Sequence, residues 1–216
     1  AQFEGIKEAH YISMDPAEDV LELPLKKIRG NNTNRISSPP IMYLPQYSSE
    51  SSKNYKSEMN FDELRKKYAF IVFQHGSQDW SDRGTFKINK GNNILIEAFA
   101  KYLAVDNKNK DSALVLIEYG SDVNKSKELI AKLKIESNVV WLPKMQRKDI
   151  MLAISNSDIG VGELGKRHWF SYSCAFEFMT MKKPMIHHRN DAFYKAKGLD
   201  LYPMVDANSV QKVYDT

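Results

Sequence analysis

Short apolar segments alternate with amphipathic segments over most of this chain, and no other feature of the sequence constrains its fold as much. The first apolar segment, residues 69–73, is typical of a strand that is covered on both faces of a sheet. Residues 91–103 follow it with apolar side chains at helical spacing. Further strands are expected at 113–117, 138–142, 158–161, 185–187 and 202–205, and further helices at 126–133, 147–155, 172–181 and after Asn208. Because strands that alternate with helices form parallel sheets with right-handed crossovers, we predict an α/β fold with a doubly wound parallel sheet.

Residues 1–67 lack this regular alternation and predict no core of their own. The elements expected there are a strand near 9–13, an interrupted helix at 18–28, an edge strand at 41–45, a serine-rich linker at 48–57 and a helix at 60–67. Asn60 is a suitable cap for the last of these. We therefore place a boundary between this segment and a doubly wound domain at 68–216.

Composition excludes several kinds of protein. The net charge of +4 comes from scattered lysines, which argues against nucleic-acid binding. The one cysteine, Cys174, can form neither an internal disulfide nor a cysteine-based zinc cluster, and the adjacent His187 and His188 are not spaced as metal ligands. No apolar run reaches the roughly 20 residues of a membrane-spanning helix. The single cysteine is compatible with a reducing compartment, and the start at Ala1 without a methionine suggests a fragment.

Lys90 and Glu177 are the main candidates for a ligand site. Ligands of doubly wound folds bind at the carboxyl ends of the strands, and Lys90 lies in the loop that leads from the first strand into the helix at 91–103. A phosphate placed there gains the ammonium charge and the unpaired amides of the helix start. Glu177 lies within the helix at 172–181, where a carboxylate can hold vicinal sugar hydroxyls. We therefore predict a nucleotide-sugar site, with a solvated lysine and an exposed helical glutamate as the alternatives.

Further candidates lie in the neighbouring loops. They are Arg83, as a second cation for a diphosphate; Ser171, Tyr172 and Ser173, as hydroxyls and amides at a helix start that can receive phosphate oxygens; and Pro143 and Met145, in a loop whose backbone can contact a base. Glu163 is a second carboxylate in these loops, with a solvated loop acid as the alternative. His75, at a strand end, is interpreted as a packing or hydrogen-bonding residue.

Three sequence blocks carry a resemblance to a known family. Residues 70–76 end a strand in Gly76, residues 90–99 read Lys-Gly-Asn-Asn-Ile-Leu-Ile-Glu-Ala-Phe, and residues 177–186 read Glu-Phe-Met-Thr-Met-Lys-Lys-Pro-Met-Ile. The expected strands between the last two blocks fit the same order. Together these blocks resemble the C-terminal, donor-binding half of GT-B glycosyltransferases, specifically the retaining group called family 4. The resemblance extends over residues 68–216.

The resemblance implies a Rossmann-like donor domain at 68–216, preceded at 1–67 by the end of an N-terminal domain and the interdomain linker. By resemblance, Lys90 would hold the diphosphate of a nucleotide-sugar donor and Glu177 its ribose hydroxyls. The intact enzyme would transfer the sugar, with retention, to a saccharide or lipid-linked acceptor bound by the missing N-terminal domain. The fragment alone is expected to be inactive, and neither a cofactor nor a metal is expected. The expected location is the cytoplasm, or the inner face of the membrane in the intact enzyme, although nothing in the sequence supports membrane association.

Two positions depart from the family pattern. Trp169 stands where the family usually has a glutamate, eight positions before Glu177, and Ser77 stands where it has an arginine after the first-strand glycine. Glu163 would then substitute for the missing acid as the candidate catalytic residue, and Arg83 for the arginine. These departures leave two alternatives open, a non-catalytic binding or scaffold module of the same fold and a sugar-nucleotide epimerase. The sequence determines neither the base, the sugar nor the acceptor.

Overall fold

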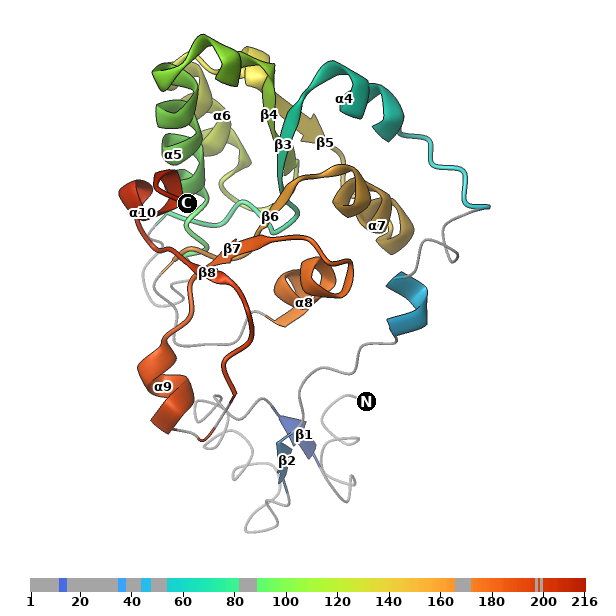
Figure 1. The fold of residues 1–216 in the computed structure, drawn as a ribbon, viewed down its shortest axis with the longest axis vertical. Helices are drawn as coiled ribbons and strands as arrows, with labels where there is room; N and C mark the ends of the chain where they lie inside the picture. The colour runs from blue at the N-terminus through green and yellow to red at the C-terminus, as the bar shows by residue number, and fades with distance from the viewer. Residues whose placement is uncertain are drawn as a thin grey trace.

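A six-stranded sheet forms the framework of the molecule, and all of its strands are parallel, in the order β5-β4-β3-β6-β7-β8 (Figure 1). The computed structural model describes residues 12–14, 35–37, 44–47, 54–81, 89–165, 172–196, 198 and 200–216. The strands are β3 (Phe70–Gln74), β4 (Ser112–Ile117), β5 (Val139–Leu142), β6 (Ile159–Val161), β7 (Met185–His187) and β8 (Val205–Asp206). From β3 the chain extends the sheet to β5, then returns to add β6 on the other side of β3. The predicted doubly wound sheet is therefore confirmed, with its topological switch between β3 and β6.

Helices cover both faces of the sheet (Figure 1). One face packs against α5 (Asn92–Val105), α6 (Val123–Leu133) and α10 (Val210–Tyr214), and the other against α4 (Phe61–Lys67), α7 (Arg147–Asn156) and α8 (Tyr172–Thr180). The remaining helical segments are α9 (Asp191–Ala196), η2 (Leu44–Tyr47), η3 (Asn107–Asp111) and η4 (Glu136–Asn138). Among the described residues, none of these helices is long and apolar enough to cross a bilayer.

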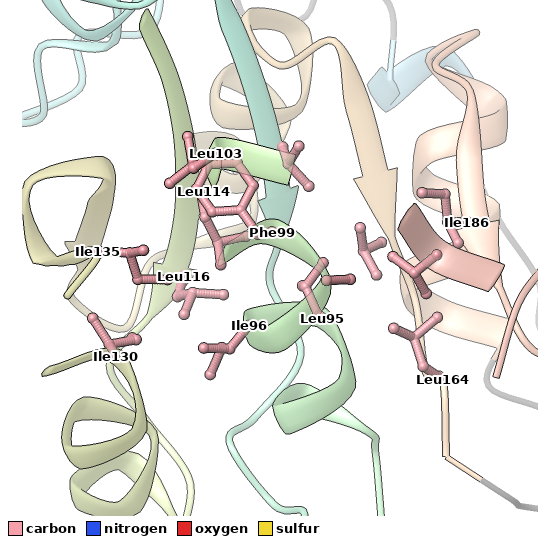
Figure 2. Packing of buried hydrophobic residues seen from close by; sticks show 14 of the residues in the cluster. Leu95, Ile96, Phe99, Leu103, Leu114, Leu116, Ile130, Ile135, Leu164 and Ile186 are labelled. Carbon is pink, nitrogen blue, oxygen red and sulfur yellow. The ribbon is translucent and has the colours of Figure 1, made fainter. Parts of the chain in front are cut away.

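Strand β4 is apolar from Ala113 to Ile117 because both of its faces are covered. Successive side chains of a strand point to opposite faces of a sheet. Leu114 and Leu116 pack against α5 and α6 on one face (Figure 2), whereas Ala113, Val115 and Ile117 pack on the face that α7 and α8 cover. All five side chains are at most 1% exposed. The central residues of a strand buried on both faces are therefore all apolar, and the only polar residue of β4 is Ser112 at its start.

Close packing of α8 on β6 depends on Gly160. A Cβ atom at this position would lie 2.2 Å from the ring of Phe178, a fully buried residue of α8. Only a residue without a side chain allows the helix to approach the strand this closely. This contact places the α8 residues, including Glu177, beside the carboxyl end of the sheet.

Outside β3 to β7, several predictions need correction. The edge strand expected at 41–45 is wrong for Leu44 and Pro45, which belong to the 3-10 helix η2; proline fixes φ near the helical value and cannot donate to a strand ladder. The last strand is β8, two residues long and later than expected, and α9 was not predicted. The helix expected at 18–28 lies outside the described residues. Asn60 does cap α4, because its Oδ1 accepts a hydrogen bond of 3.1 Å from the amide of Glu63.

Of the described elements before β3, η2 and α4 pack onto the domain. Strands β1 (Ile12–Met14) and β2 (Arg35–Ser37) pair with each other in parallel. Nearer to the sheet, Phe61 of α4 joins the core that α7 and α8 cover, and Tyr47 of η2 is 5% exposed, with η2 packed on α8. The domain boundary at 67/68 stays a prediction.

The contribution of the central core can be measured by shortening Leu116. Leu116→Ala removes a side chain that is 0% exposed, so the free energy of unfolding is expected to fall by about 2–5 kcal/mol, because a cavity adds to the lost burial. Leu201→Ala is the matched control, since Leu201 is 39% exposed and should change stability by about 0.5 kcal/mol or less. Urea unfolding followed by circular dichroism measures both. Equal losses in the two variants would contradict the assignment of Leu116 to the core.

Candidate functional site

The loops that follow β3 and β6 meet at the carboxyl end of the sheet, and two buried side chains join them to each other and to α5. Gln74, the last residue of β3, donates from Nε2 to the carbonyl of Gly162 after β6, at 3.1 Å. Asn92, the first residue of α5, donates from Nδ2 to Gln74 Oε1 at 2.9 Å. Both side chains are at most 1% exposed. Their amides therefore tie β3, the loop after β6 and the start of α5 into one rigid edge at the topological switch.

A second set of hydrogen bonds joins the loop after β3 to the loop after β4. The amide of Gln78 donates to the carbonyl of Tyr119 at 2.8 Å, and the amide of Asp122 donates to the carbonyl of Gln78 at 2.7 Å. The carboxylate of Asp122, 1% exposed, accepts from the amides of Trp80 and Ser81 at 2.8 and 2.9 Å. These bonds satisfy backbone groups that a buried loop would otherwise leave unpaired.

Asp79 is held in its charged form within this loop. Its Oδ1 accepts hydrogen bonds from the amide and the hydroxyl of Ser121, at 3.0 and 2.9 Å. Burial acts to raise the pKa of Asp79, but the hydrogen bonds from Ser77 and Ser121, together with the charge of Lys90, hold that pKa below its ordinary value. Asp79 therefore adds a negative charge beside Lys90.

Lys90 lies where the sequence predicts it, just before the helix at the end of this loop. Its amide donates to the carbonyl of Asp79 and its carbonyl accepts from the amide of Leu164, at 2.8 and 2.9 Å. Gly91 then turns the chain into α5 with a φ of +71°, a value that L side chains rarely adopt. The Nζ of Lys90 lies 3.4 Å from Glu163 Oε1. The structure thus brings together two predicted site residues, the phosphate-binding candidate and the candidate catalytic acid, as an ion pair.

Glu177 is buried, so the alternative of an exposed helical glutamate is wrong. It is 3% exposed, and three side chains surround its carboxylate. Oε1 accepts from Arg147 and, at 3.3 Å, from the hydroxyl of Tyr47. Oε2 lies 3.0 Å from His75 Nε2, although this contact lacks the alignment of a hydrogen bond. A carboxylate with so little solvent needs such partners, because an unpaired buried charge is strongly destabilising.

His75 connects Glu177 to Cys174, one turn earlier in α8. The Sγ of Cys174 lies 3.6 Å from His75 Nδ1. Burial acts to raise the pKa of the Cys174 thiol, but the charge and hydrogen bond of His75 and the charge of Lys90 together hold it below its ordinary value. Glu177 thus contacts His75 directly, and the charge of Lys90 acts on the thiol that His75 contacts.

The other predicted site residues differ in their burial and in their contacts. Gly76 lies at the end of β3, where an added Cβ would meet no atom within 4 Å, and Ser77 is 9% exposed. Met145 packs at the edge of the core, whereas Pro143 is exposed. Tyr172 and Ser173 open α8 as expected. Arg83, Trp169 and Ser171 lie outside the described residues. Within the part of the chain that the structure describes, no group of histidine, cysteine and carboxylate side chains could hold a metal ion.

Arg147 and Tyr47 were not predicted from the sequence to belong to the site. His75 was interpreted as a packing or hydrogen-bonding residue. Arg147 opens α7 directly after a loop already predicted to face the site, so its charge and place were a usable signal. Tyr47 had no such signal. It precedes β3 by more than 20 residues and reaches Glu177 only because η2 packs on α8.

His187 positions the loop that carries Glu163. Its Nδ1 accepts a hydrogen bond of 3.0 Å from the amide of Glu163, and the amide of His188 donates to the Glu163 carbonyl at 2.9 Å. Burial lowers the pKa of His187 to about 4, helped by the charges of His188 and Arg189. His187 is therefore neutral at physiological pH and keeps the lone pair that this bond requires.

Comparison with solved structures relates this fold to that of glycosyltransferases. A glycosyltransferase of Rickettsia africae, HepE of Anabaena in complex with UDP and glucose, and sucrose-phosphate synthase of Thermosynechococcus elongatus align with TM-scores of 0.58, 0.56 and 0.59 at 18%, 16% and 14% identity. The alignments cover 93%, 90% and 99% of this chain but only 50%, 49% and 49% of those chains, so the chain spans about half of their length. No protein-family model and no curated sequence matches the chain. At these identities, the likeness shows a shared Rossmann-like α/β fold.

The buried, neutral His187 predicts a specific dependence of stability on pH. Between about pH 4 and 6.5 the unfolded chain binds a proton at this histidine and the folded chain does not, so the free energy of unfolding rises with pH in this window. His187→Asn keeps an acceptor near the Nδ1 position but does not titrate. The stability of wild type relative to this variant should therefore increase with pH by up to about 1.4 kcal/mol per pH unit. Urea unfolding at several pH values from 4.5 to 7.5 measures the difference, and parallel curves would refute the assignment.

Proposed function

We propose that this chain binds a nucleotide-diphosphate sugar at the carboxyl end of its sheet and that the complete protein is a retaining GT-B glycosyltransferase of family 4. The observation that carries the proposal is the position of Lys90 and Glu177 at the carboxyl end of the sheet, beside the switch between β3 and β6, where Lys90 pairs with Glu163 and Glu177 contacts His75. This is the place where doubly wound folds bind ligands. The fold shared with glycosyltransferases, among them HepE in complex with UDP-glucose, adds support.

In this proposal the diphosphate binds at Lys90. Its ammonium group and the first amides of α5, a helix of 14 residues, supply the positive field that a diphosphate requires. The ion pair with Glu163 is the contact that the ligand would weaken, because both anions attract the same Nζ. Arg83, Ser77 and the start of α8 at residues 171–173 are proposed as further contacts to the phosphates.

Glu177 is proposed to accept hydrogen bonds from the ribose hydroxyls. A carboxylate offers about four lone-pair sites and can accept from two vicinal hydroxyls at once. The loop after β5, with Pro143 and Met145, is proposed to border the base, and Gly76 leaves space for the ligand at the end of β3.

The proposed reaction transfers the sugar to an acceptor hydroxyl with retention. The bond from the anomeric carbon to the diphosphate oxygen breaks, a bond to the acceptor oxygen forms, and the acceptor proton passes to the departing phosphate. Lys90 and the α5 amides would stabilise the charge on that leaving group. Glu163 is the proposed acid near the transferred sugar. The saccharide or lipid-linked acceptor would bind a further domain, for which residues 1–67 form the end and the linker, in the cytoplasm or at the inner face of a membrane.

A non-catalytic binding or scaffold module is the second candidate, and the ion pairs favour it. Lys90 is paired with Glu163, and Glu177 with Arg147, so the charges of the site are already neutralised within the chain. A scaffold would keep these pairs permanently, whereas a donor site must exchange them for ligand contacts. Nucleotide binding separates the two candidates.

Nucleotide binding and its dependence on two residues test the proposal. Calorimetry with UDP, GDP and ADP should show binding of at least one of them by the wild type, together with a rise in melting temperature. Lys90→Met and Glu177→Gln, which keep side-chain size, should each weaken that binding roughly 10- to 100-fold, because each removes a charge-assisted contact.

Two exposed residues of α6 provide the matched controls. Lys132→Met and Glu128→Gln make the same chemical changes away from the site and should leave the affinity unaltered. If no nucleotide binds, the hypothesis of a non-catalytic scaffold module replaces the proposal. If binding is equal in all four variants, the ligand lies elsewhere.

A further inference from the structure

The carboxylate that would hold the ribose is closed off by the protein itself. Glu177 is 3% exposed and Tyr47 is 5% exposed, so the two side chains shield each other from solvent. Oε1 accepts from both Arg147 and the Tyr47 hydroxyl, which accounts for its two lone pairs. A ligand hydroxyl can therefore reach Oε1 only if one of these donors leaves.

The Tyr47 hydroxyl makes the two bonds that a ligand hydroxyl would make at this place. It accepts a hydrogen bond of 2.6 Å from Arg147 Nη1 and donates to Glu177 Oε1 at 3.3 Å. A sugar hydroxyl has the same capacity, one proton to donate and lone pairs to accept with. Tyr47 is thus an internal substitute for the ligand.

Of the three partners of Glu177, Tyr47 is the one whose departure requires the least rearrangement. His75 follows the central strand β3 directly, and Arg147 opens α7, a helix packed on the sheet. Tyr47 comes from η2, a 3-10 turn of four residues that packs on α8. Such a short helix has little stability of its own, so its place depends on its tertiary contacts.

We propose that Tyr47 is a gate over the nucleotide site, because its hydroxyl occupies the position of a ribose hydroxyl on Glu177, and that Arg147 donates to whichever hydroxyl is bound there. This inference rests on the proposed function and adds a form of regulation to it. Nucleotide binding displaces Tyr47 and moves η2, so η2 responds to the donor. The competition lowers the apparent affinity, because part of the binding free energy is used to release the gate.

The gate predicts a gain of affinity from a conservative change. Tyr47→Phe keeps the ring but removes the competing hydroxyl, so UDP, or whichever of the three nucleotides binds the wild type, should bind about tenfold more tightly. Tyr68→Phe is the matched control. Tyr68 is 6% exposed and donates to the carbonyl of Ser137, but it precedes β3 and so lies at the opposite end of that strand from the site. The Tyr68→Phe variant should bind the nucleotide with the same affinity as the wild type.

Tyr47→Phe made in a Glu177→Gln variant tests whether the gain in nucleotide affinity depends on Glu177. In Glu177→Gln the amide can no longer attract both hydroxyls as a charged acceptor, so adding Tyr47→Phe should change the affinity by less than about twofold. Calorimetry of the two single variants, the double variant and the wild type completes the cycle.

The outcomes distinguish the gate from the proposed function. A gain in Tyr47→Phe that disappears in the Glu177→Gln background supports the gate. If Tyr47→Phe binds as the wild type does, or more weakly, while Glu177→Gln still weakens binding, the gate is overturned and the nucleotide site stands. If the full set of nucleotides fails to bind wild type and Tyr47→Phe alike, the proposed function fails, and the gate fails with it.

Discussion

The pairing of β3 with β4 on one side and β6 on the other is the constraint on which the rest of the structure depends. Because the chain leaves β3 in one direction and returns on the other side, the loops after β3 and β6 diverge at the carboxyl end of the sheet. Gln74 and Asn92 hold the two sides of this opening together through buried amides. Among the described residues, Lys90 and Glu163 belong to the loops at this edge, and Glu177 contacts His75, which directly follows β3.

The charges of the site are matched within the chain. Lys90 faces Glu163, and Glu177 faces Arg147, while Asp79 and Cys174 have lowered pKa values that reflect the hydrogen bonds and cations around them. Buried or half-buried charges are tolerated only with such partners. A ligand that carries both phosphates and hydroxyls could replace these internal contacts one by one. This is the physical link between the ion pairs in the structure, the proposed donor site and the proposed gate at Tyr47.

The sheet could be predicted where its strands are buried on both faces, as at β3 and β4, because a short uninterrupted apolar run is typical of such a strand. Helix α9 was missed and strand β8 was misplaced, since both are short and carry little periodicity. Lys90 and Glu177 could be chosen as candidates because one precedes a helix start at a strand end and the other interrupts an apolar stripe. Arg147 was overlooked at a usable position, whereas Tyr47 lies between the expected edge strand at 41–45 and the expected linker at 48–57, where no local pattern pointed to the site.

By itself, the sequence determined the fold class, the order of the strands and helices from β3 to β7, and which loops follow the carboxyl ends of those strands. These properties follow from local patterns, namely burial, helical spacing and the chemistry of loop residues. Only the tertiary structure decided that Glu177 is buried, that Glu163 pairs with Lys90 and that His187 is a neutral acceptor. It also decided that Tyr47 reaches Glu177, across 130 positions of sequence. The physical reason is that burial and charge pairing are set by side chains that come from different elements, and no local pattern encodes which of them meet.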